Sequence, residues 1–200
     1  MGKDGGSHQT VEDIALMRVV PGMTIICPCD ANEAEKAVIA AAEYEGPVYI
    51  RLARGPNPII KSNLNFKIGK ANVLRDGADL VLFACGIMVF TALECAKEIE
   101  KKYHKIVAVI NIHTIKPLDA ECIVKYAEKC KKVVTLEEHS VIGGLGDAVM
   151  DLLFNKTGVT MKKIGINDCF GQTGDADELL EEYGLSLSAV EKKIENFLEN

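Results

Sequence analysis

The sequence predicts an α/β protein built from two parts. Short apolar runs, typical of strands, alternate along the chain with segments whose apolar residues recur at helical spacing. This alternation is typical of a mainly parallel sheet covered by helices. The run Gly55-Pro56-Asn57-Pro58 interrupts it, because clustered glycine and proline residues exclude regular structure. We therefore expect a first part at residues 1–58, a linker at 59–66 and a second part at 67–200.

The first part follows the order helix, strand, helix, strand after a polar N-terminal run. Asp30 is expected to begin the second helix, where Glu33 three residues later completes a capping box. Gly46-Pro47 ends that helix. A strand, a helix and a strand in this order form one unit of a parallel sheet. The expected elements are a helix at 11–18, a strand at 23–27, the helix from Asp30 and a strand at 48–52.

The second part repeats the alternation over a longer stretch. Its run at 79–84 is continuously apolar, as expected for a strand whose sheet is covered by helices on both faces. Asp175 and Glu178 form another capping box. The expected strands are 67–74, 79–84, 106–110, 133–136 and 161–166. One helix is expected between the strands at 79–84 and 106–110. Further helices are expected after Asp119, after Gly143-Gly144, after Asp175 and from about residue 188.

Composition and charge exclude several classes of protein. The chain is 48% hydrophobic, as folded globular proteins are, and its net charge of −6 argues against a nucleic-acid partner or an anionic membrane surface. No apolar run approaches the ~20 residues of a membrane span, and the N-terminus lacks the apolar core of a signal peptide. We expect a soluble, cytoplasmic protein.

The cysteines favour buried thiols in a reducing compartment over a disulfide or zinc site. Only Cys27-Pro28-Cys29 is a close pair, and zinc would require further ligands nearby. The seven positions are 27, 29, 85, 95, 122, 130 and 169.

The N-terminal run Asp4-Gly5-Gly6-Ser7-His8-Gln9 places an acid and a histidine four residues apart in a glycine-rich loop. Composition alone favours a solvated loop. A loop that delivers functional groups requires a rigid scaffold on both sides, and no strand precedes this one. We therefore expect that the preceding half of the scaffold is missing from this chain.

The longer run DGGSHQTVEDIALMR resembles the middle of the pyrimidine-binding domain of transketolase, a thiamine-diphosphate enzyme. Six further segments resemble the same family in its order and spacing, and it is the ordered set that is specific. The resemblance implies a truncated thiamine-diphosphate-binding (pyrimidine) domain, followed by a transketolase C-terminal domain with a mainly parallel sheet between helices and one antiparallel edge strand. The segments are PGMTIICPCDANEAEKAV, GPVYIRLAR, IGKANVLRDGADLVLFACG, IKPLD, TLEEHSVIGGLGDAV and FGQTGDADELLEEYGLS.

The resemblance also implies roles for three residues. Asp4 corresponds to an aspartate that hydrogen-bonds a hydroxyl of the sugar substrate, and His8 to a catalytic histidine near the thiazolium that also contacts substrate. Arg54, expected to be a surface residue or a ligand from its position alone, corresponds to the arginine that binds the substrate phosphate. Forked guanidinium donors suit this task. Arg51 is the reserve candidate.

The run Glu137-Glu138-His139 suggests a metal or acid/base cluster between a strand end and a glycine turn. A helix N-terminus after that turn could hold an anion. We favour a structural role at the domain edge. His104 lies among lysines and is expected to be solvated, whereas His113 is ambiguous.

The resemblance implies a two-carbon ketol transfer between ketose and aldose phosphates, as in the pentose phosphate pathway. The complete enzyme would use thiamine diphosphate and Mg²⁺. The chain has no Gly-Asp-Gly motif for the diphosphate, so we expect it to bind neither cofactor nor metal and to be inactive alone. Its expected partners are an N-terminal transketolase domain or subunit, sugar phosphates and further copies, as in a dimer. The alternatives are a fragment of 1-deoxyxylulose-5-phosphate synthase, a 2-oxo acid dehydrogenase β-subunit, or a non-catalytic assembly or regulatory module.

Overall fold

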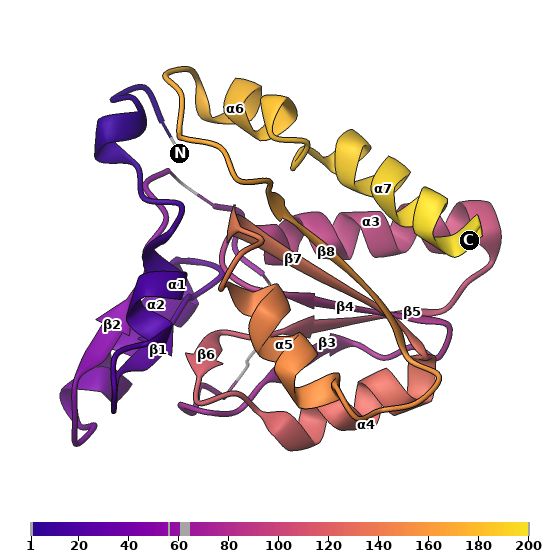
Figure 1. Cartoon of the computed structure of the whole chain (residues 1–200), viewed down its shortest axis with the longest axis horizontal. Helices are drawn as coiled ribbons and strands as arrows, with labels where there is room; N and C mark the ends of the chain where they lie inside the picture. The colour runs from indigo at the N-terminus through magenta and orange to yellow at the C-terminus, as the bar shows by residue number, and fades with distance from the viewer. Residues whose placement is uncertain (1, 56, 61–64, 200) are drawn as a thin grey trace.

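The computed structural model describes residues 2–55, 57–60 and 65–199 (Figure 1). Within these residues the strands form a three-stranded sheet of order β2-β1-β6 and a five-stranded sheet of order β3-β5-β4-β7-β8. Pro56 of the predicted breaker and residues 61–64 of the predicted linker lie outside the described residues, as do residues 1 and 200. No described helix is both long enough and apolar enough to cross a membrane.

The first part follows the predicted order of elements. The Asp30 side chain accepts a hydrogen bond from the Glu33 N–H and so caps the second helix. The Glu33 carboxylate, however, accepts from the N–H of Cys29 rather than from that of Asp30. The elements are the 3₁₀ helix η1 (Gly6–His8), α1 (Asp13–Arg18), β1 (Thr24–Ile26), α2 (Ala31–Ala42) and β2 (Val48–Ile50).

The five-stranded sheet is mainly parallel. Its edge strand β3 pairs antiparallel with β5, and the other neighbours pair parallel, as the family resemblance implies. β3 is shorter than predicted, because a turn in which Lys70 N donates to Lys67 O occupies the start of the expected strand. The strands of the second part are β3 (Asn72–Arg75), β4 (Leu80–Ala84), β5 (Val107–Asn111), β6 (Thr114–Lys116), β7 (Lys132–Ser140) and β8 (Thr160–Ile166).

Alternate residues of β4 pack into two different cores. Leu80 and Leu82 pack with α3 and α7, whereas Val81 and Phe83 pack with α4 and α5. Figure 1 shows these two pairs of helices on opposite faces of the sheet. Burial on both faces explains why β4 is apolar at every position. The helices are α3 (Met88–Tyr103), α4 (Ala120–Cys130), α5 (Leu145–Leu153), α6 (Ala176–Glu182) and α7 (Leu187–Glu199).

The two parts are joined by contacts that the sequence analysis did not predict. β6, a three-residue strand of the second part, pairs antiparallel with β1 of the first. The Lys116 ammonium donates to the carbonyls of Arg18 and Val20, which lie at the end of α1. Val11 and Ile14 pack into the two cores of the second part. The division at residues 58 and 67 stays a prediction.

Candidate functional site

A cavity of about 170 Å³ lies where the N-terminal loop meets the chain after β2 and the end of β7. Its lining is mostly polar and comes from segments that are distant in sequence. The lining residues are Gly2, His8, Gln9, Thr10, Asp13, Tyr49, Ile50, Arg51, Leu52, Ala53, Arg54 and Glu138.

The three residues singled out by the family resemblance gather at this cavity. His8 and Arg54 line it, and the Asp4 carboxylate forms an ion pair with the Arg54 guanidinium. The side chains of Arg54 and Asp4 are 62% and 40% exposed, so both are accessible to a solute. His8 ends η1, is exposed, and its Nδ1 lies 3.1 Å from the Ser7 hydroxyl. The structure therefore brings the three together, and their individual roles stay predictions.

Arg51, the reserve candidate, is committed to protein oxygens. Its Nε donates to both carboxylate oxygens of Asp13 at 3.0 and 3.1 Å, and its Nη1 donates to Glu138 Oε2 at 3.3 Å. Its Nη2 donates to the carbonyls of Thr10 and Glu138. All three side chains of this ion-pair network are largely buried. Arg51 thus ties the N-terminal loop to α1 and β7, whereas Arg54 is the more exposed of the two arginines that line the cavity.

The Asp13 side chain belongs to the wall of the cavity, which sequence reasoning did not predict. It accepts a hydrogen bond from the Tyr49 hydroxyl at 2.7 Å, in addition to those from Arg51. Burial, followed by this bond, raises the pKa of Tyr49 to about 12. Asp13 and Arg51 are separated by 38 residues, so no local pattern could have indicated their pairing.

The predicted position of Glu137 was wrong, because β7 continues through it to Ser140 rather than ending before it. The buried carboxylate accepts from the backbone N–H groups of Leu145 and Gly146 at 2.6 and 2.9 Å. Burial raises its pKa to about 7, against the opposing effect of these two donors. The acceptor at the N-terminus of α5 is thus supplied by the protein itself.

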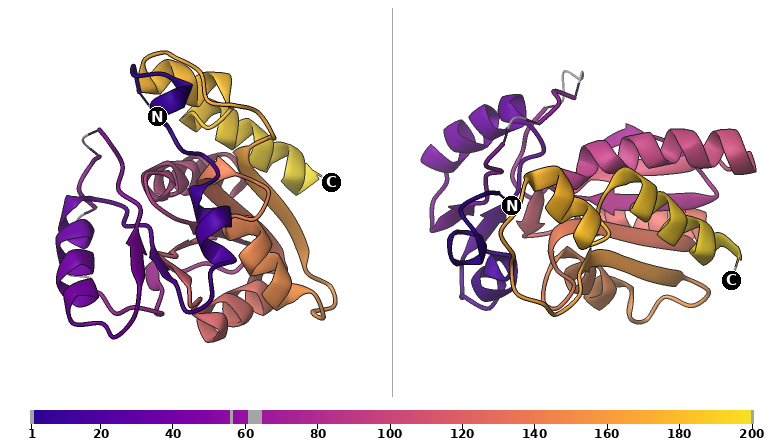
Figure 2. Two further views of the ribbon diagram at one scale, coloured as in Figure 1. Left: turned by 60° about the vertical axis from the view of Figure 1, so that its left-hand side comes forward. Right: turned by 90° about the horizontal axis from the view of Figure 1, so that it is seen from above.

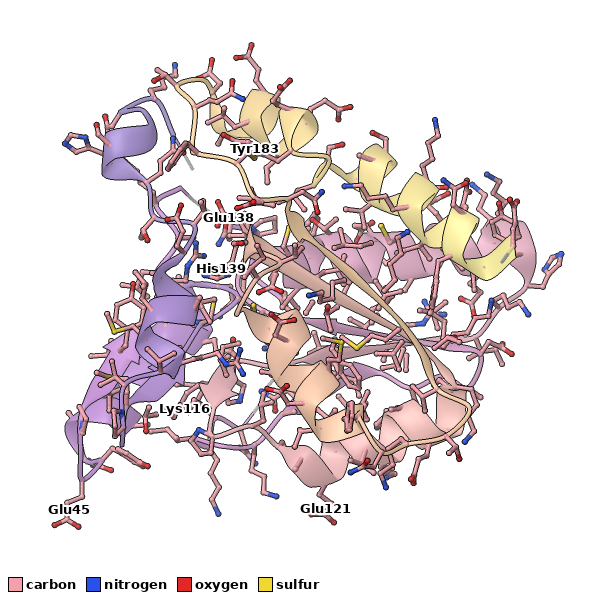
Figure 3. The ribbon with its side chains drawn as sticks, viewed as in Figure 1. Glu45, Lys116, Glu121, Glu138, His139 and Tyr183 are labelled. Carbon is pink, nitrogen blue, oxygen red and sulfur yellow. The ribbon has the colours of Figure 1, made fainter. Side chains whose placement is uncertain are left out.

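His139 connects β7 to the first part of the chain. Its Nε2 accepts from the N–H of Ala15 at 3.3 Å, and its Nδ1 lies 2.7 Å from the Ser140 carbonyl. These contacts fit a neutral imidazole with the proton on Nδ1, and burial lowers the pKa of the ring. Figure 3 shows Glu138 and His139 at the end of the sheet that faces α1. Both residues contact the first part, as a structural role at the domain edge requires.

The remaining histidines and the cysteines do not add to the cavity. His104 is exposed at the C-terminus of α3. His113 is buried against the Phe66 ring at 4.4 Å between centroids, and burial lowers its pKa. All seven cysteines are free thiols, and five of them are buried.

The described residues include no clustered set of metal ligands. No cluster of three or more His, Cys, Asp or Glu side chains that could hold a metal ion occurs among them. The carboxylates of Asp13 and Glu138 at the cavity are already bound by Arg51.

Comparison with known families identifies both parts of the chain. Residues 69–190 match the family model of the transketolase C-terminal domain, and residues 1–58 match that of the transketolase pyrimidine binding domain. The chain belongs to the transketolase family. The family and the fold class that the sequence predicts are thereby confirmed.

Relatives with more specific names are longer than this chain. It is 44% identical over 198 residues to a Methanocaldococcus jannaschii protein provisionally named a transketolase C-terminal section, covering 97% of this chain and 61% of that protein. It is 42% identical over 188 residues to the 6-deoxy-6-sulfo-D-fructose transketolase subunit SqwH of a Clostridium species, covering 94% and 58%. The chain thus spans about three fifths of these transketolase relatives.

Two solved transketolase structures share the fold. One, described as a split gene transketolase in an inactive beta4 tetramer, has a TM-score of 0.88 and 42% identity, over 97% of this chain and 63% of that chain. A transketolase variant from Pichia stipitis, with a TM-score of 0.76 and 20% identity over 99% of this chain and 28% of that chain, supports the fold alone. The chain thus resembles, in sequence and fold, the C-terminal section of transketolase-family proteins.

Proposed function

We propose that this chain is part of an enzyme that transfers a two-carbon ketol unit between ketose and aldose phosphates with thiamine diphosphate. The observation that carries the proposal is the meeting of Asp4, His8 and Arg54 at one cavity. A carboxylate, an imidazole and a guanidinium are suited to a hydroxyl, a developing alkoxide and a phosphate, respectively. A sugar phosphate carries hydroxyls, a phosphate and a carbonyl oxygen that becomes the alkoxide during the reaction.

Each residue has one role in this proposal. Asp4 accepts a hydrogen bond from a substrate hydroxyl, which discriminates against the epimer whose hydroxyl points elsewhere. His8 donates a hydrogen bond to the oxygen at the reacting carbon. Arg54 binds the phosphate at the far end of the substrate with its forked donors.

The proposed assembly includes a second section that holds the cofactor. Transketolase-family enzymes use thiamine diphosphate, and the match to the pyrimidine binding domain fits this cofactor. We assign no residue of this chain to the metal or the diphosphate, since the described residues include no clustered set of metal ligands. The proposed partner of this chain is an N-terminal transketolase section. We propose that the resulting complex forms a homo-oligomer, a dimer in its simplest form. It would act in the cytoplasm, in the pentose phosphate pathway.

The chain alone is expected neither to bind thiamine diphosphate with Mg²⁺ nor to turn over sugar phosphates. Calorimetric titration should give no saturable binding tighter than ~1 mM, which corresponds to about −4 kcal/mol. Addition of the N-terminal section should restore binding and ketol transfer together. Tight binding by the chain alone would contradict the proposal that the N-terminal section holds the cofactor.

A second candidate activity is that of 1-deoxy-D-xylulose-5-phosphate synthase. The enzyme of that name from Pelotomaculum thermopropionicum is 38% identical over 199 residues, although the chain covers only 31% of it. The same reconstituted enzyme distinguishes the two when it is offered a ketose phosphate or a 2-oxo acid as donor. Turnover of the 2-oxo acid alone would favour the synthase.

Arg54→Ala is expected to weaken the use of phosphorylated acceptors by the assembled enzyme. The loss in kcat/KM should correspond to about 1.5–3 kcal/mol, the range for hydrogen bonds to charged groups. Unphosphorylated glycolaldehyde should be nearly unaffected, because it does not reach the arginine. The measurement is kcat/KM across both acceptors, and an equal loss for the two would make the role of Arg54 structural.

Asp4→Ala provides the matched control because Asp4 is the ion-pair partner of Arg54. It should lower kcat/KM for α-hydroxy aldehydes and erode their stereochemical preference, with little change for acceptors that lack the hydroxyl. If the two variants gave the same acceptor profile, the ion pair rather than separate substrate contacts would explain both.

A further inference from the structure

We propose that the segment at 170–175, between β8 and α6, positions the loop that carries Asp4 and His8, and that Tyr183 is the positioning residue that holds this segment. The inference rests on the proposed function of that loop. It assigns to the second part of the chain a role in the candidate site, although none of these residues lines the cavity. Both views in Figure 2 show the N-terminal end of the chain beside the segment that leads into α6.

Side chains of the N-terminal loop reach the segment at two points. Gln9 Nε2 donates to the Gln172 carbonyl at 3.1 Å and to the Gly2 carbonyl at 2.6 Å, so one amide links both ends of the loop to the segment. The Lys3 ammonium lies 2.8 Å from the Asp175 carboxylate. Both contacts with the segment are exposed, whereas the bond from Gln9 to Gly2 is partly buried. Gln9 differs from Lys3 because its amide also holds the start of the loop.

The backbones of the loop and the segment approach so closely that only glycine fits. A Cβ on Gly6 would lie 2.2 Å from the Gly171 carbonyl oxygen, and a Cβ on Gly5 would lie 2.6 Å from Thr173 Oγ1. Gly5 also has a φ of 84°, which disfavours other residues. The glycines of this loop thus allow it to pack against the segment as well as to turn.

Tyr183 connects the segment to the hydrophobic core. Its hydroxyl accepts from the N–H of Gln172 at 2.7 Å and lies 3.3 Å from the Phe170 carbonyl, to which it donates. Tyr183 is 8% exposed and belongs to the same core cluster as Leu179. Figure 3 shows Tyr183 at α6, beside the segment that leads into this helix. The order of contacts runs from the core through Tyr183 and Gln172 to Gln9 and the loop.

The loop needs this support because it is rich in glycine. Glycine has the largest conformational freedom to lose, so a free loop would place Asp4 and His8 in many positions. Catalytic groups must be held within about 0.5 Å of their productive geometry. A displacement of about 1 Å can lower the rate 10²-fold. A hydroxyl distant from the cavity can therefore affect the reaction through position alone.

The test compares Tyr183→Phe and Gly6→Ala with a matched control, Tyr126→Phe. Tyr183→Phe removes only the hydroxyl, and Gly6→Ala introduces the close contact with Gly171 at a residue whose φ is not positive. Tyr126, on α4, is also buried, but its hydroxyl donates a hydrogen bond to Asp76. Millisecond hydrogen exchange on the full chain should show about fivefold faster exchange of residues 5–10 in the first two variants, as for loss of one net hydrogen bond. The control should match the parent.

The second measurement uses the enzyme reconstituted with its N-terminal section. Tyr183→Phe should lower kcat/KM for α-hydroxy aldehydes about fivefold more than for acceptors that lack the hydroxyl, as Asp4→Ala does, while Tyr126→Phe changes neither. Unchanged exchange in Tyr183→Phe would overturn the positioning role. Faster exchange with an equal loss for all acceptors would also overturn it, in favour of general destabilisation. Failure of Asp4→Ala to affect any acceptor would instead count against the proposed function.

Discussion

Replacement of Arg51 by methionine is expected to lower the free energy of unfolding by about 3–5 kcal/mol. Methionine retains the apolar stem of the side chain but removes the donors to Asp13 and Glu138. Both carboxylates are largely buried, so each would lose a charge partner without gaining water. A loss of this size is a large part of the stability of a typical domain.

The measurement is urea denaturation of the full chain, monitored by circular dichroism. Arg54→Met is the matched control, because Arg54 lies three residues later and its side chain is mostly exposed. Exposed ion pairs contribute about 0–1 kcal/mol, so this control should unfold near the parent midpoint. Equal effects in the two variants would show that the buried network does not stabilise the junction between the two parts.

Replacement of His8 by alanine is expected to lower kcat of the assembled enzyme about 10²-fold or more. This is the range for loss of a general acid–base group or of one preorganised donor to a developing oxyanion. The loop should keep its fold, because His8 is exposed and its one described side-chain hydrogen bond is with the neighbouring Ser7. Thermal unfolding of the variant should therefore match that of the parent.

His104→Asn provides the control for a surface histidine. His104 is exposed at the C-terminus of α3 with a φ of 54°, a conformation that asparagine also tolerates. Single-turnover kinetics of both variants, at saturating acceptor, would separate loss of chemistry from loss of binding. A kcat for His8→Ala within about threefold of the parent would remove the proposed catalytic role.

The structural predictions that held best were those that depend on a few neighbouring residues. The continuous apolar run of β4 predicted a strand covered on both faces, and it packs into both cores. Asp30 predicted a helix start, and its side chain caps α2. An ordered set of motifs predicted the family, and both family models match. Each of these predictions depends on local spacing or on motif order, which the sequence contains directly.

Where the predicted residues meet, and which of them already pair with other protein groups, follows from the three-dimensional packing. Arg51 and Arg54 are both arginines near the end of β2, but only the fold brings Asp13 and Glu138 to the first of them, across 38 and 87 residues. The contact between Gln9 and Gln172 spans 163 residues. The three residues of β6 are too few to show a strand period, and their pairing depends on β1. Local spacing and motif order were enough to predict the family, the fold class and the candidate residues. Their partners depend on the packing of distant segments, because burial and charge pairing depend on distance in space.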